Sequence, residues 1–419
     1  MRKRMLGMLV GVAVMAIATS AFADADWNLT GQGARSLGMG GAFIGICDDA
    51  TALSWNPAGL AQLDRPELSG VFKLETHKNY WTPKSYTQGG TTYNLNYKSS
   101  NTHFVPNFFS GAFPLKVAQR NLTFALAYQQ QLDFYFLSTS SDSTKKSEQT
   151  GGAYTLSPGL AYQILPQLAL GVAGNIWMNH ATYTHTDKTD PTYNYTYNEP
   201  YSGFNLLFGA HAKLKHFKVG AILRTPTTIK YYRDYTELGS AYIQNKRRPV
   251  SGDNKQKLPF MFGFGMAVEP TQNFTLAADL DIRPYSNMEI LDSAGVRVDT
   301  SALDKHPNTT QIRLGAEYLL MLHQAIVPLR VGFRTDPKTY YGTIYTPVGQ
   351  PNKLGDQVVG TAFTFGTGVA VKHFELDWAF EYAHSKNPTT YDASYGYSPS
   401  TINWNATYLR WLMSAIFKF

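Results

Sequence analysis

The sequence has little cysteine, little charge and no long apolar run. Its 419 residues include one Cys, which excludes an intramolecular disulfide framework and any zinc or iron–sulfur site built from several thiolates. Charged residues make up 16%, below the roughly 25% of soluble proteins, which argues against disorder and against a charged coiled coil. The richest apolar stretch after the N-terminal region, residues 318–331, is broken by His323, Gln324 and Pro328. Membrane-spanning helices, which need about 20 apolar residues, are therefore excluded.

Residues 1–23 are predicted to be an export signal. They combine the basic residues Arg2–Arg4 with the apolar run Leu6–Ala18 and a small-x-small cleavage site at Ala21–Ala23. No cysteine follows that site directly, so we expect no lipoprotein anchor. Loss of three basic residues lowers the net charge from +7 to +4 (+7 minus 3), and we therefore expect no nucleic-acid partner.

The mature chain alternates apolar and polar residues with a period of two, which is the signal of β-strands. From Phe274 to Ile282 every second residue is apolar, whereas Asp279 and Asp281 lie on the opposite face, and Phe374–Tyr382 repeats the pattern. The segments are about 9–13 residues long with unusually aromatic apolar faces, and a tilted strand of an outer-membrane barrel needs about 9–11 residues. The pattern favours a transmembrane antiparallel β-barrel over a soluble β-sandwich.

Fourteen such segments predict an all-β fold, a barrel of about 14 strands that leaves no backbone group unpaired in lipid. They are Leu68–Thr76, Phe108–Leu115, Asn121–Gln130, Tyr154–Ile164, Leu168–Met178, Phe204–Leu214, Phe217–Arg224, Leu258–Val268, Phe274–Ile282, Ile312–Leu320, Val327–Phe333, Ala362–Val371, Phe374–Tyr382 and Thr407–Phe419.

The connections between these segments alternate between short turns and long tracts. The long tracts, of roughly 23–33 residues, are rich in Tyr, Thr, Ser, Asn, Gly and Pro, as the outside loops of outer-membrane barrels are. Because periplasmic turns are short, we expect both termini on the periplasmic side. The predicted turns lie at Arg120-Asn121, Pro166-Gln167, Lys215-His216, Pro270-Thr271 and Lys372-His373.

Residues 24–66 lack the alternation and consist largely of small residues and turn formers. Gly31 and Gly33 begin a glycine-rich stretch, but Ser36 stands where a dinucleotide-binding loop needs its third glycine, and no βαβ unit surrounds it. We therefore interpret the glycines as positions where the backbone packs tightly inside the barrel. Asn56-Pro57 predicts a turn or a helix start.

The stretch Gly33–Leu63, GARSLGMGGAFIGICDDATALSWNPAGLAQL, resembles the N-terminal hatch of the FadL/TodX family of outer-membrane transporters for hydrophobic compounds. Segments such as SPGLAYQILPQLALGVAGNI and PLRVGFRTDP resemble barrel strands of that family, so the resemblance covers nearly all of the mature chain. The family's hatch pattern has counterparts in Arg35, in Gly38, Met39, Gly40, Gly41 and Ala42, in Asp49-Ala50, and in Asn56, Pro57, Ala58 and Gly59.

The resemblance implies three parts: a signal peptide (1–23), a hatch that plugs the lumen (24–66) and a transmembrane β-barrel (67–419). It also implies capture of a ligand near the extracellular side and its release sideways through the wall. The implied function is passive uptake of hydrophobic compounds, such as long-chain fatty acids or aromatic hydrocarbons, across the Gram-negative outer membrane. The implied partners are outer-membrane lipid, the hydrophobic ligand and the outer-membrane insertion machinery, with no cofactor. The alternative is a structural or secretion-accessory barrel, resembling the PorV branch of the superfamily, that binds partner proteins.

The sequence has no sign of catalysis, since neither a G-x-S-x-G elbow nor a Ser/His/Asp arrangement is present. The cluster of His180, His185, Asp187 and Asp190 is better explained by a polar loop than by a metal site, and we predict no metal. For Asp48-Asp49 we favour salt bridges within the plug over calcium. Cys47 is expected to be a small buried residue.

Alternation places charges of both signs inside the barrel. Their default interpretation is a hydrogen-bonded network that ties hatch to wall, and the sharper one is that an Arg binds a carboxylate headgroup. The terminal Phe419, with aromatics at alternate positions before it, resembles the signal read by the insertion machinery. The candidate lumen charges are Arg224, Arg313, Arg330, Arg334, Arg410, Glu317, Asp279, Glu375 and Asp377, and with them Lys73, Glu269, Asp281 and Glu381.

Overall fold

The computed structural model describes residues 29, 31–83, 85–88, 91–94, 98–139, 143–240, 254–299, 305–346, 352–391 and 400–419. The predicted signal peptide and its cleavage site lie outside these residues. No helix in the described part of the chain is long and apolar enough to cross a membrane.

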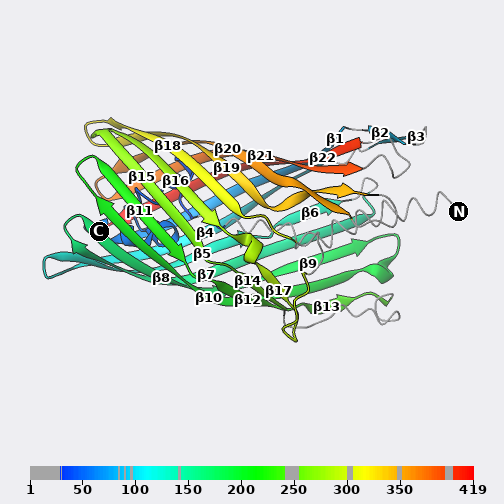
Figure 1. The fold of residues 1–419 in the computed structure, drawn as a ribbon. Helices are drawn as coiled ribbons and strands as arrows, with labels where there is room; N and C mark the ends of the chain where they lie inside the picture. Colours follow the sequence, from blue (N-terminus) through cyan, green and yellow to red (C-terminus); the bar gives the residue numbers. More distant parts are fainter. Residues whose placement is uncertain are drawn as a thin grey trace.

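Fourteen strands form the wall of a closed antiparallel barrel, in which each strand pairs with the next and the last, β22, pairs with the first, β1 (Figure 1). The prediction of a 14-stranded all-β barrel is confirmed, and each predicted segment overlaps one wall strand. The wall consists of β1 (Glu67–Thr82), β4 (Lys98–Val117), β5 (Arg120–Asp133), β7 (Lys145–Leu165), β8 (Leu168–Met178), β10 (Tyr195–Lys213), β11 (Phe217–Arg224), β15 (Met261–Thr271), β16 (Phe274–Arg283), β18 (Thr309–Met321), β19 (Ile326–Tyr345), β20 (Lys353–Val371), β21 (Phe374–Tyr391) and β22 (Ser400–Lys418).

Many strands continue well past the ends predicted for them, so much of the sequence expected to be loop is strand. β1, for example, runs to Thr82 instead of Thr76. Tyr and Thr favour strands, and ring contacts such as His77 on Tyr408 and Trp81 on Trp404 join the extended ends. Further short strands and 3-10 turns lie at this end: β2 (Ser85–Gln88), β3 (Thr91–Asn94), β6 (Phe136–Thr139), β9 (His180–Asp187), β12 (Thr227–Tyr231), β13 (Asp234–Leu238), β14 (Asn254–Leu258), β17 (Glu289–Leu291), η2 (Pro191–Tyr193) and η3 (Tyr285–Asn287).

Short turns join the strands at the opposite end, where the C-terminus also lies (Figure 1). Three of the predicted turns are correct, but β5 already begins at Arg120 and β15 ends only at Thr271. The turn before β5 is made by Ala118 and Gln119, with φ of 50° and 61°, as a tight type I′ hairpin requires. In an outer-membrane barrel this short-turn end faces the periplasm.

The two faces of the wall differ in polarity as a membrane barrel requires. Along β15, Phe262, Phe264 and Met266 are exposed on the outside, while the glycines between them face inward. The outer face of the last strand carries Trp411 and Phe417. An apolar band that faces lipid and a polar lumen are the arrangement of outer-membrane barrels.

The N-terminal part fills the lumen. We call residues 31–66 the hatch; it contains α2 (Ala34–Gly38), α3 (Ala52–Trp55) and η1 (Pro57–Gln62). Its apolar side chains, such as Met39, Phe43 and Leu53, are fully buried and share one core with small residues of the wall. The plug expected inside the barrel is therefore present.

Candidate functional site

The hatch lies against a ring of wall glycines whose missing side chains make room for it. A Cβ atom on any of them would contact hatch atoms at or below van der Waals distance. Glycine in a strand interior weakens the strand and commonly marks the close approach of another backbone. The ring runs over eight strands, from β7 to β20, and consists of Gly159, Gly171, Gly209, Gly220, Gly265, Gly315, Gly332 and Gly366.

The Gly38-Met39-Gly40-Gly41 motif of the hatch packs against the inner face of β18, β19 and β20. Gly40 and Gly41 have φ of 66° and 81°, the left-handed region that favours glycine. A Cβ atom at Gly40 would lie 2.7 Å from the carbonyl oxygen of Leu314. Thr364 completes the contact, because its hydroxyl accepts from the Gly40 N–H and donates to the Gly38 carbonyl, both at 3.0 Å.

The Asn56-Pro57-Ala58-Gly59 motif joins two parts of the hatch to each other and to β10. The Asn56 amide donates to the carbonyls of Ile44 and Ala210, both at 3.0 Å, and its oxygen accepts from the Ala58 N–H at 3.1 Å. Asn56 thus caps η1, and Pro57 occupies the first position of that turn, where a missing N–H costs nothing. A Cβ atom at Gly59 would overlap the Cys47 carbonyl.

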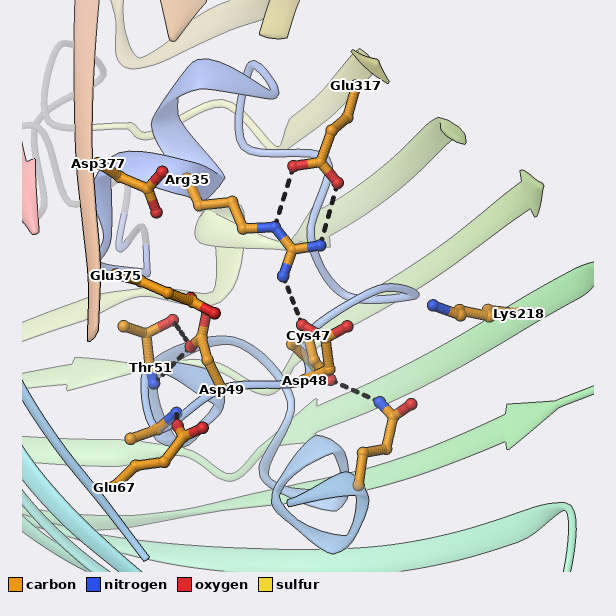
Figure 2. A network of polar contacts seen from close by, with 12 residues as sticks. Arg35, Cys47, Asp48, Asp49, Thr51, Glu67, Lys218, Glu317, Glu375 and Asp377 are labelled. Atoms are coloured by element: carbon orange, nitrogen blue, oxygen red, sulfur yellow. Dashed lines mark hydrogen bonds and ion pairs between the residues drawn. The ribbon is translucent and has the colours of Figure 1, made fainter. Parts of the chain in front are cut away.

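Arg35 connects the hatch to the wall (Figure 2). Its guanidinium bonds Asp48 of the hatch at 2.5 Å and holds Glu317 of β18 through two bonds of 3.1 and 3.2 Å. Such a bidentate pair fixes orientation as well as charge. A second connection is made by Asp279 of β16, which accepts from the N–H groups of Phe43 and Ile44 at 2.7 and 2.9 Å.

The neighbouring residues Asp48 and Asp49 bind different partners. Asp48 forms the expected salt bridge with Arg35. Asp49 does not: its carboxylate accepts from the N–H and hydroxyl of Thr51 at 2.7 and 2.5 Å (Figure 2). Burial raises the pKa of Asp49 to about 6, and the charge of Arg35 opposes that rise. Cys47 is buried, as predicted.

The remaining lumen charges pair mainly between wall strands. Arg330 bridges Glu317 and Asp377, both at 2.6 Å. Arg334 and Arg410 share Glu381, and Arg410 also bonds Glu75 at 2.6 Å. The sequence correctly placed these groups inside. Charged side chains that tie the hatch to the wall include Arg35, Asp279 and Glu67 of β1, which accepts from the Ala50 N–H at 3.0 Å.

Two further candidates, Glu375 and Arg313, form other contacts. Glu375 bonds Lys418 of β22 at 2.5 Å, and the same ammonium group lies 3.7 Å from Glu67 of β1. Arg313 pairs with Asp281 and stacks over the Trp55 ring of the hatch, with its guanidinium carbon 5.4 Å from the ring centroid. It therefore fixes the hatch through an aromatic contact.

Arg224 differs from every other candidate, because it forms no ion pair within the described residues. The residue is 9% exposed, and its Nη1 has no hydrogen-bond partner among the described residues. It lines a cavity of about 30 Å³ together with Leu29, Trp55 and Met261, room for about one water molecule. A buried guanidinium without a directly bonded carboxylate is costly. Asp281 lines the same cavity, but its carboxylate pairs with Arg283 and Arg313.

A buried apolar cluster lies next to Arg224, on the loop side of the hatch. Leu29, which precedes the hatch in the chain, belongs to this cluster. The Arg283 guanidinium donates a hydrogen bond to the Leu29 carbonyl at 2.9 Å. The sequence does not reveal this cluster, because most of its members come from tracts predicted to be loops; Trp177, Leu258 and Met261 alone among them lie in predicted strands. We call it the upper cluster; it comprises Leu29, Leu132, Phe134, Ala153, Trp177, Ala181, Tyr201, Ile229, Leu258, Met261, Tyr285 and Met288.

The histidine and aspartate group near β9 has an ordinary structural role. Asp187 accepts from the N–H and hydroxyl of Thr189 and pairs with Lys145 at 3.0 Å, and His185 shares a hydrogen bond with Ser147. In the part of the chain that the structure describes, no three His, Cys, Asp or Glu side chains are grouped so as to hold a metal ion.

Solved structures of outer-membrane transporters resemble this fold. A FadL homologue from Pseudomonas aeruginosa aligns with a TM-score of 0.64 and 11% identity, covering 94% of this chain and 100% of the other. The toluene transporter TbuX from Ralstonia pickettii gives 0.59 and 14%, covering 94% and 100%. The toluene transporter TodX from P. putida gives 0.56 and 13%, covering 94% and 99%. At these identities the likeness shows the fold.

Of two sequence comparisons, one finds no match and the other finds a family. A search of curated protein sequences finds no match. The profile of the family described as "Outer membrane protein transport protein (OMPP1/FadL/TodX)" matches residues 10–409. The chain therefore belongs to the OMPP1/FadL/TodX family of transport proteins of the Gram-negative outer membrane.

Proposed function

We propose that the protein is a passive channel that takes up hydrophobic compounds, long-chain fatty acids or aromatic hydrocarbons, and releases them sideways into the membrane. The observation that carries the proposal is the hatch, which lies directly against wall glycines on eight of the strands. Each CH₂ gains about 0.8 kcal/mol on leaving water, so a long-chain compound favours the apolar upper cluster over an aqueous path. The printed names of TbuX and TodX, both toluene transporters, support the same class of cargo.

Release would then require a shift of the hatch or a gap in the wall. No nucleotide-binding motif is present in the sequence, so the concentration gradient is the driving force in this proposal. The alternative, a barrel that binds partner proteins, is not favoured, because the family and the structural neighbours are those of transport proteins.

Arg224 offers a test that separates two classes of cargo. In cells that carry the protein, uptake of labelled oleate and of labelled toluene should both exceed uptake in cells that lack it. Arg224→Leu should lower oleate uptake about tenfold, because a charge-assisted hydrogen bond is worth about 1.5–3 kcal/mol. Toluene carries no charge that Arg224 could bind, so toluene uptake by the variant should stay within about twofold of wild type.

The matched control is Arg120→Leu at the short-turn end, which removes a charge far from the upper cluster and should change neither uptake. Equal losses of oleate and toluene uptake in Arg224→Leu would assign Arg224 a structural role. Uptake that is the same with and without the protein would rule out the channel itself.

Assembly is proposed to depend on Phe419 and the insertion machinery. The Phe419 N–H donates to the Pro66 carbonyl at 3.0 Å, but the residue as a whole is 67% exposed, so it adds little to the packing of the folded barrel. Deletion of Phe419 should therefore lower the folded, heat-modifiable fraction in cells. Refolding of the purified chain in detergent should be nearly unchanged. Deletion of Gly295 in an exposed loop is the control, and equal folded yields in cells from both deletions would contradict the proposal.

A further inference from the structure

The outer face of the wall has a groove where β10 changes partner. Toward the short-turn end, β10 pairs with β11, and this ladder begins with Leu207 opposite Arg224. Toward the loop end, β10 pairs with β12, where Tyr201 lies opposite Tyr231. Between the two ladders lies Pro226, which has no N–H to donate. The interruption leaves a groove of about 400 Å³, lined by Ser202, Gly203, Phe204, Pro226, Thr228 and Lys230.

The groove lies at the boundary between the apolar band and the polar rim. Phe204 is 55% exposed and shares the outer face of β10 with Phe208. One step further toward the loops the same face carries Ser202, and the neighbouring β12 carries Thr228 and Lys230, all exposed. The floor of the groove is therefore at the level of acyl chains, and its loop-side edge is at the level of lipid headgroups.

Two lysines face each other at this edge without a counter-charge. Lys230 of β12 lies directly opposite Lys255 of β14, while Ile229 and Gln256 beside them are buried inside the barrel. Like charges in directly opposite positions destabilise a pair of strands. The adjacent Lys257 is neutralised by Glu289 at 3.1 Å, but neither Lys230 nor Lys255 has an ion-pair partner in the described ranges.

We propose that this groove binds a phosphorylated glycolipid of the outer leaflet, with its phosphate monoester between Lys230 and Lys255 and an acyl chain on Phe204. A phosphate monoester carries a charge of about −1.5 to −2 near pH 7, which matches two lysines, whereas a phosphodiester lipid carries a single negative charge. Ser202 and Thr228 supply hydroxyls at the same edge. The site is on the lipid side of the wall, so it is separate from the uptake path, and it requires the loop end to face the outside.

The test uses the whole protein, purified from outer membranes in mild detergent. Lys230→Gln with Lys255→Gln removes both charges and also their mutual repulsion, so the variant should fold at least as well as wild type. The matched control is Lys353→Gln with Lys386→Gln, two exposed lysines on β20 and β21 at the same end. Native mass spectrometry with added bis-phosphorylated lipid A, its dephosphorylated form and phosphatidylglycerol measures binding to each protein.

Wild type and control should bind the phosphorylated glycolipid equally, and the groove variant at least about tenfold more weakly. The dephosphorylated form should bind wild type as weakly as the phosphorylated form binds the variant. Equal binding by wild type and variant would overturn the proposal, as would equal affinity for phosphatidylglycerol. Uptake of oleate and toluene should be unchanged in the variant, so failure of this proposal and failure of the proposed transport function give different results.

Discussion

Replacement of Glu381 by leucine should destabilise the folded barrel by about 3–5 kcal/mol, the cost of removing one partner from a buried ion pair. Glu381 is 0% exposed and accepts from both Arg334 and Arg410. Arg410 would keep Glu75, but Arg334 would keep no carboxylate directly bonded to it among the described residues. Urea unfolding of the barrel in lipid vesicles, followed by tryptophan fluorescence, measures the change.

Two variants test the physical reason. Glu148→Leu removes a carboxylate that pairs with Lys146 at a half-exposed position, and its cost should be about 0–1 kcal/mol. Combining Glu381→Leu with Arg334→Leu removes the orphaned charge and should restore part of the lost stability. If the double variant were less stable than Glu381→Leu alone, desolvated charge would not be the cause.

The wall of the barrel could be predicted from the sequence, because membrane strands are constrained by lipid on one face and polar groups on the other. Every segment from Leu68–Thr76 to Thr407–Phe419 overlaps a strand of the structure. The strand ends could not be predicted, because the regular alternation of apolar and polar residues does not continue into them. The extension of β1 to Thr82 depends on partners such as Trp404, which lies more than three hundred residues away in the chain.

The candidate site was predictable by residue type and face, but not by partner. Alternation placed Arg330 and Glu381 inside correctly, yet which carboxylate meets which arginine depends on strand order and stagger. Arg224 looked the same as the other arginines, and only the structure shows that its Nη1 has no hydrogen-bond partner among the described residues. The glycine ring did leave a signal: Gly315 and Gly332 stand at inward positions of predicted strands, and such glycines mark close backbone approach.

That glycine ring gives the prediction with the largest expected effect on permeability. Gly332→Leu should open the lumen to hydrophilic solutes, because a Cβ atom at this position would overlap the backbone nitrogen of Gly40. The pairing of β19 with β18 and β20 uses backbone groups, so the barrel itself should still form. The rate at which intact cells with a periplasmic β-lactamase hydrolyse nitrocefin measures the leak, and we expect a rise of at least about tenfold, as for an unplugged barrel whose water-filled channel passes small solutes.

The control is Gly70→Leu on the outer face of β1, where the nearest side-chain atom to an added Cβ would be 3.5 Å away. It makes the same chemical change in a wall strand but leaves the hatch untouched, so nitrocefin hydrolysis should stay at the wild-type rate. Gly315→Leu, whose Cβ would overlap the Met39 carbonyl, should reproduce the leak from the neighbouring strand. Both inward variants could instead be folded and heat-modifiable, with nitrocefin hydrolysis at the wild-type rate. In that case the Gly38–Gly41 segment does not close the lumen, and movement of this segment would not explain the uptake of hydrophobic compounds.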